Sequence, residues 1–100
     1  MTNQNWIKSK DGSFAISLEE IPFSLVKNSD VPRYSIYWWN KNDTNPYASM
    51  MDLLNLVAPD PDVPMPIEQK VYDLVMQNYG EYLTVKFNNY CEEKGYKNDN

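Results

Sequence analysis

The start of the chain alternates between apolar and polar positions with the period of two that is typical of half-buried strands. The dipeptide Asp11-Gly12 is a turn signal, because both residues tolerate positive φ. The pattern predicts a hairpin with strands near residues 5–9 and 13–18. With the turn at Asp11-Gly12, Ile7 falls opposite Ile16.

Residues 33–39 carry the clearest strand pattern of the chain, since they are aromatic or β-branched almost throughout. We expect one face, with Tyr34, Ile36 and Trp38, to enter the core. The opposite face carries Tyr37 and Trp39, which are equally suited to the core and to a binding surface. Residues 19–31 before this strand are expected to be irregular with at most a short helical turn. Residues 17–20 resemble a capping box, but Pro22 would lie inside the first turns of the helix and obstruct it.

A helix is predicted over residues 46–58. Asn45 and Pro46 combine a favoured N-cap residue with a proline at the first helical position. Pro59 ends the pattern. Apolar residues at helical spacing form one stripe, and this stripe is expected to face the core: Tyr47, Met50, Met51, Leu54, Val57 and Ala58.

A second and longer helix is predicted over residues 66–93, after a stiff proline-rich loop at 59–66. Gly95 is expected to end it, and a strand at 82–87 is the alternative. Two apolar stripes run along it. One contains Ile67, Val71, Leu74, Tyr82 and Val85, and we assign it to the core; the other contains Tyr72, Met76, Tyr79, Leu83, Phe87 and Tyr90.

These elements predict a single α+β domain over residues 1–100. A small antiparallel sheet, made of the N-terminal hairpin and the strand at 33–39, is expected to pack against the two helices at 46–58 and 66–93. No apolar run is long enough to cross a membrane, and the N-terminus lacks the apolar stretch of a signal peptide. A cytoplasmic location is therefore expected.

The composition argues against catalysis. The chain has no His, one Cys and three isolated Gly residues, so it lacks the usual base near neutral pH, a CxxC motif and a phosphate loop. Cys91 is followed by Glu92 and Glu93, which would disfavour its reactive thiolate form, so we interpret it as structural. A paired-carboxylate hydrolase could in principle use Asp60 with Asp62 or Glu19 with Glu20, but acids this close in sequence are common on any acidic surface. We expect no enzyme and no cofactor.

A metal site is not expected either. Asp60 and Asp62 imitate the first spacing of a calcium loop, but Pro64 stands at the next ligand position. Val71 occupies the position of the closing Glu. A solvated loop is the better interpretation of these two acids.

Charge is the most informative feature of the sequence. The chain carries 14 acidic and 9 basic residues, a net charge of −5. Residues 42–69 hold five of the acids and no Lys or Arg, beside several methionines, so we expect a binding surface for a protein partner there. The residues predicted to contact the partner are Asp43, Asp52, Leu53, Leu56, Asp60, Asp62 and Glu68, with Tyr37 and Trp39 on the sheet.

Two classes of function fit these features. The first is a small acidic inhibitor that neutralises a basic, nucleic-acid-acting protein, as a bacterial immunity protein does with its toxin or a phage inhibitor with a host defence system. The second is an accessory or structural domain that self-associates as a homodimer through the apolar stripe of residues 72–90. Direct binding to nucleic acid or to a membrane is not expected of an acidic surface.

Overall fold

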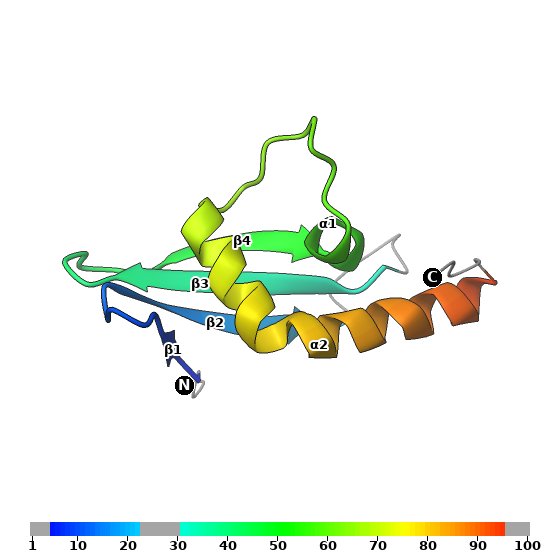
Figure 1. The fold of residues 1–100 in the computed structure, drawn as a ribbon, viewed down its shortest axis with the longest axis horizontal. Coiled ribbons are helices and arrows are strands. Elements are labelled where there is room, and N and C mark those ends of the chain that lie inside the picture. Colours follow the sequence, from blue (N-terminus) through cyan, green and yellow to red (C-terminus); the bar gives the residue numbers. More distant parts are fainter. Residues whose placement is uncertain (1–4, 23–30, 96–100) are drawn as a thin grey trace.

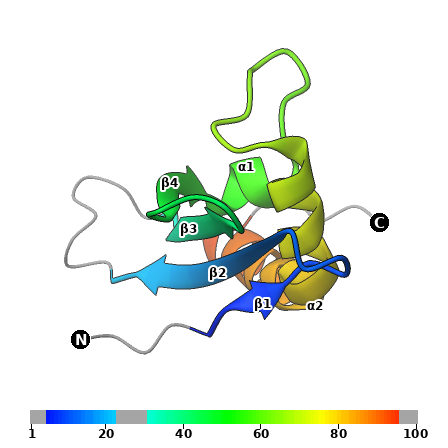
Figure 2. The same cartoon turned by 90° about the vertical axis from the view of Figure 1, so that its left-hand side faces the viewer.

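The computed structural model describes residues 5–22 and 31–95 and has the expected α+β class. Four antiparallel strands lie side by side in the order β1-β2-β3-β4, and two helices pack on one face of this sheet (Figure 1). Among these described residues, no helix lies on the opposite face of the sheet (Figure 2). The elements are β1 (Ile7–Lys8), β2 (Phe14–Ile21), β3 (Arg33–Asn40), β4 (Tyr47–Asp52), α1 (Leu53–Val57) and α2 (Gln69–Lys94).

The N-terminal hairpin is confirmed, with Ile7 paired to Ile16. Its turn is held by the carboxylate of Asp11. One oxygen of this group accepts hydrogen bonds from the Ser13 backbone N–H at 3.0 Å, the Ser13 hydroxyl at 2.7 Å and the Ser9 hydroxyl at 2.8 Å. Gly12 has φ 74°, the left-handed conformation that favours glycine.

Strand β2 is longer than predicted. It continues to Ile21 and pairs with β3 along its whole length, ending with Ile21 opposite Arg33. The expectation of irregular structure is therefore wrong for residues 19–21, where pairing with β3 decides the conformation. Residues 23–30 of the segment predicted to be irregular lie outside the described residues.

The centre of the core is one face of β3. Tyr34 and Ile36 are fully buried there and Trp38 nearly so, as the alternation predicts. They form one cluster with residues from the other strands and both helices, among them the fully buried Val71, Val75 and Leu83 of α2. Burial in this cluster raises the pKa of the Tyr34 hydroxyl.

Helix α2 runs unbroken for 26 residues and ends at Gly95, which has φ 75°. The alternative of a strand at 82–87 is therefore wrong, and the helix begins at Gln69 rather than at residue 66. Our division of its apolar stripes fails in the C-terminal half. Tyr82 and Val85 are exposed, whereas Leu83 from the other stripe is fully buried.

The helix predicted over 46–58 is the largest error. Residues 47–52 form β4, which pairs antiparallel with β3, and only the five residues of α1 are helical. The apolar residues of this segment fit both the strand period of two and the helical period of about 3.6 residues. Strand pairing is favoured because the second edge of the aromatic strand β3 would otherwise leave a row of backbone N–H and C=O groups without partners.

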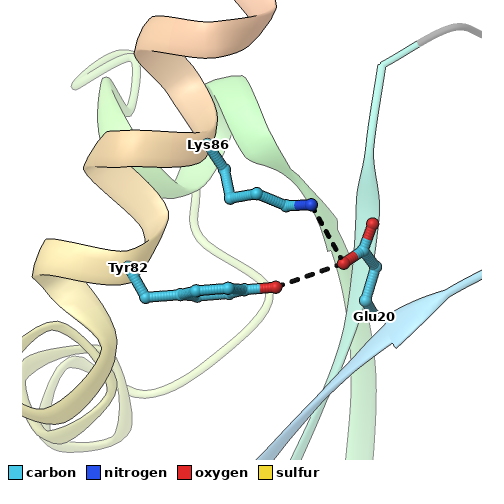
Figure 3. A network of polar contacts seen from close by, with 3 residues as sticks. All are labelled: Glu20, Tyr82 and Lys86. Carbon is cyan, nitrogen blue, oxygen red and sulfur yellow. Dashed lines mark hydrogen bonds and ion pairs between the residues drawn. The ribbon is translucent and has the colours of Figure 1, made fainter.

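A small polar network joins the end of β2 to the middle of α2. The Glu20 carboxylate accepts a hydrogen bond from the Tyr82 hydroxyl at 3.1 Å and forms an ion pair with Lys86 at 3.4 Å (Figure 3). The charged groups are about one-third exposed, so the ion pair contributes at most about 1 kcal/mol. It fixes the position of the helix on the sheet more than it stabilises the fold.

Neighbouring apolar residues of α2 test this packing. Leu83→Ala should lower the free energy of unfolding by about 2–5 kcal/mol, since a fully buried side chain leaves a cavity. Val85→Ala, at a position 52% exposed, should change it by less than about 0.5 kcal/mol. Urea denaturation of both variants measures the difference, and equal losses would contradict the orientation of α2.

The hairpin turn predicts a pH dependence. The hydrogen bonds from Ser13 and Ser9 lower the pKa of Asp11 from 3.8 to about 2. A carboxylate with a depressed folded-state pKa stabilises the fold above its unfolded pKa, and this contribution is lost as the pH falls from about 4 to about 2. Asp11→Asn should therefore flatten the pH dependence of the urea midpoint in that window. Identical pH profiles for the wild type and the variant would contradict the role of the carboxylate.

Candidate functional site: an acidic groove at the edge strand

A groove of about 460 Å³ lies between β4, helix α1 and the proline-rich loop. In Figure 1 this loop rises above β4 and returns to the start of α2. Its walls combine apolar side chains with a few charged ones. The residues that define its character are Met50, Met65, Val63, Asp52, Asp60 and Arg33.

The groove reaches the free edge of the sheet. Met50 and Met51 are neighbours in β4, so their side chains point to opposite faces, yet both line the groove. The groove therefore runs along β4. β4 is the last strand of the sheet, and we call this feature the edge groove.

The loop at 59–66 forms the outer wall of the edge groove. Its prolines restrict the backbone, and Asp60 closes a turn: its carboxylate accepts from the Asp62 N–H at 2.9 Å and its carbonyl from the Val63 N–H at 3.1 Å. The segment is therefore a loop, as predicted, although it contains this turn rather than a continuous extended chain. Val63 is left 59% exposed at the rim.

Acidic side chains flank β4 at both ends. Asp52 and Asp60 line the groove beside the end of the strand. At its start, the carboxylate of Asp43, with a smaller effect from Glu68, raises the pKa of the Tyr47 hydroxyl, which shows that both acids lie near it. The acidic segment of the sequence is thus gathered around one strand edge.

Asp52 has a structural role that the sequence did not reveal. Its carboxylate caps α1, accepting from the Asn55 N–H at 2.8 Å and from the Asn55 side-chain amide at 3.2 Å. Capping leaves the charge in place at the edge groove. However, a change at Asp52 alters the helix as well as the surface potential.

Two of the predicted contact residues are excluded by the fold. Leu53 and Leu56 are fully buried in the core cluster, because α1 is rotated relative to the helix we expected over 46–58. Tyr72 closes over the same helix and donates a hydrogen bond from its hydroxyl to the Leu56 carbonyl at 2.7 Å. Neither leucine can touch a partner.

Tyr37 and Trp39 lie on the helix-free face of the sheet, away from the edge groove. The Tyr37 hydroxyl donates to Glu19 at 3.2 Å. Trp39 packs edge-to-face on Trp6, with ring centroids 5.7 Å apart, and its indole N–H donates to the Asp43 carbonyl at 3.0 Å. A second hollow of about 470 Å³ adjoins this corner, and it is lined by Lys8 and Lys41 as well as Asp43.

The edge groove includes residues that the sequence did not single out as contacts. Met50 was assigned to a core stripe but is 54% exposed. Arg33 comes from a distant part of the chain and is brought to the groove by the pairing of Arg33 with Asp52. The only sequence signal was the presence of methionines within the acidic segment.

Three of the four carboxylates considered for catalysis accept hydrogen bonds from neighbouring groups of the fold. Glu19 and Glu20 are adjacent in β2 and point to opposite faces, toward Tyr37 and Tyr82. In the loop turn, the Asp60 carboxylate accepts a hydrogen bond from the Asp62 backbone N–H. Within residues 5–22 and 31–95, no group of three or more metal-binding side chains comes together.

Comparisons with protein-family models, curated proteins and solved structures find no match to this chain. None of the helices in the described part of the chain is both long and apolar enough to span a membrane.

The cap at Asp52 gives a stability test. Asp52→Ala removes the acceptor for the Asn55 N–H and should cost about 0.5–2 kcal/mol of unfolding free energy. Asp52→Asn retains an oxygen acceptor and should cost much less. Urea denaturation of the two variants distinguishes capping from charge; equal stabilities of Asp52→Ala and the wild type would contradict the cap.

Proposed function

We propose that this chain is a non-catalytic inhibitor that binds a basic protein through the edge groove. The partner is expected to act on nucleic acid, as the toxin target of an immunity protein or a defence protein inhibited by a phage does. One observation carries the proposal: the segment with five acids and no bases folds around an apolar groove. Apolar surface then supplies contact area, and the acids supply selectivity for positive charge.

Charge supports an inhibitor of this kind. A protein that binds nucleic acid presents clustered Lys and Arg to the phosphates. An acidic surface is attracted to the same cluster and blocks it by occupying it. Because the acids outside residues 42–69 are balanced by nine bases, the net charge of the molecule belongs to this segment, and the long-range attraction is directed there.

The self-association alternative has lost much of the surface on which it was based. That hypothesis placed a partner copy on the stripe of residues 72–90 of α2. Tyr72, Tyr79, Phe87 and Tyr90 of this stripe pack against the core of the same chain. The inhibitor hypothesis therefore has the better-defined surface.

Photo-crosslinking would identify the partner and locate the contact. A photoreactive amino acid at Val63, on the rim of the groove, should capture a basic protein in cells. The matched position is Val85, which is similarly exposed and lies about 20 Å or more along α2 from the groove. Capture through Val85 alone would place the binding surface elsewhere.

Charge reversal predicts how the complex forms. With the captured partner purified, Asp60→Lys/Asp62→Lys should slow association at least about tenfold at low salt and flatten its salt dependence, because charges mainly steer encounter. Glu92→Lys/Glu93→Lys makes the same change in net charge at the far end of α2 and is the control. The partner's nucleic-acid activity should be blocked by the wild type and less well by the loop variant. Equal association rates for both double variants would contradict the proposal.

A further inference from the structure

The outer edge of β4 presents backbone groups that can be assigned individually. The Leu53 N–H donates to the Pro32 carbonyl at 2.9 Å, which continues the register of β3 with β4 by one position beyond Arg33 and Asp52. Hydrogen-bonded and non-hydrogen-bonded pairs alternate along an antiparallel ladder. Ser49 and Met51 therefore bond inward to β3.

It follows that the N–H and C=O groups of Ala48 and Met50 point outward, away from the sheet. Among the described residues, β4 pairs only with β3, and no other backbone or side-chain group there bonds to these two residues. These are the groups that another strand would need for pairing.

The two edge strands, β1 and β4, differ in how readily they could pair with another strand. The β1 edge has only two residues, one of which is Lys8, and short or charged edges resist pairing. The β4 edge has six residues without Pro or Lys. Its large apolar side chains Tyr47 and Met50 are about half exposed. The chain thus leaves open the edge that adjoins the groove.

We infer that the edge of β4 accepts an extended, basic segment of the partner protein as a fifth strand. This inference rests on the proposed function and specifies how the partner is held. Backbone bonds to Ala48 and Met50 would give affinity, as in other cases of strand addition. In Figure 2 the loop lies on the helix side of β4.

The side chains of the added strand would find contrasting surroundings. Alternate residues would point to the two faces of the extended sheet. Those on the helix side lie toward the loop that carries Met65 and Val63, and those on the helix-free side lie next to Met50, which also lines the groove. An occupant that alternates apolar with basic residues matches both the apolar lining and the acids around it.

Charge argues against a second copy as the occupant. Antiparallel pairing of β4 with β4 of another copy would bring the end of one strand beside the start of the other. Asp52 and Asp60 lie at the end, and Asp43 and Glu68 lie near the start. Like charges placed opposite each other destabilise such a pair, whereas a Lys- or Arg-containing strand is attracted at both ends.

A proline substitution tests strand addition. Ala48→Pro removes an outward N–H, and proline is tolerated in an edge strand when its missing N–H faced solvent. Ala48→Val keeps the N–H and adds side-chain bulk, so it is the matched control. The probe is a displayed library of random peptides of about twelve residues, enough to pair along β4 with flanking residues to spare.

The enriched peptides should alternate basic and apolar residues. Their affinity should fall at least about tenfold with Ala48→Pro and stay unchanged with Ala48→Val. In the wild type, peptide binding should protect the Ala48 and Met50 amides from hydrogen exchange. Hydrogen exchange needs no variant, so it tests strand addition even if Ala48→Pro destabilises the fold.

Three results would overturn the inference: peptides that bind Ala48→Pro as tightly as the wild type, unchanged exchange at both amides, or a salt-insensitive dimer abolished by Ala48→Pro. The Asp60→Lys/Asp62→Lys variant separates the two proposals. If it weakens peptide binding while Ala48→Pro does not, the acidic binding surface stands and strand addition fails. If charge reversal has no effect and the peptides show no basic excess, the proposed function itself fails.

Discussion

The burial of one face of β3 against α2 is the interaction on which the rest of the structure depends. Tyr34 and Ile36 on the strand and Val71, Val75 and Leu83 on the helix are buried together. Within residues 5–22 and 31–95, both helices lie on this one face of the sheet. In the same described residues, β4 pairs only with β3.

The same packing separates the buried apolar residues of the acidic segment from its exposed acids. Residues 42–69 contain the edge strand, the short helix and the loop. Their apolar residues divide between the core, which takes Leu53 and Leu56, and the surface, which keeps Met50 and Val63. The acids remain outside, where water solvates them at little cost. Two of these acids, Asp52 and Asp60, lie in the lining of the groove.

The same elements that stabilise the fold thereby shape its candidate site. Asp52 caps α1 and lines the groove, so one residue contributes both to the stability of the helix and to the candidate site. The loop turn closed by Asp60 holds Val63 at the rim. Such shared roles mean that binding experiments need variants whose stability is known, because a weakened cap and a weakened interface otherwise look alike.

The sequence by itself determined the hairpin, through the turn at Asp11-Gly12, and the central strand, through its period of two. It favoured the long helix, with its end at Gly95, over a strand at 82–87. It also determined that the net charge lies in residues 42–69. Only the tertiary structure decided that residues 47–52 are a strand, because their apolar positions suit either period and pairing with β3 selects one. It likewise decided that Leu53 and Leu56 are buried and that Arg33 joins the groove. Contacts between distant segments leave no periodic signal along a single chain, so this part of the site could not be predicted.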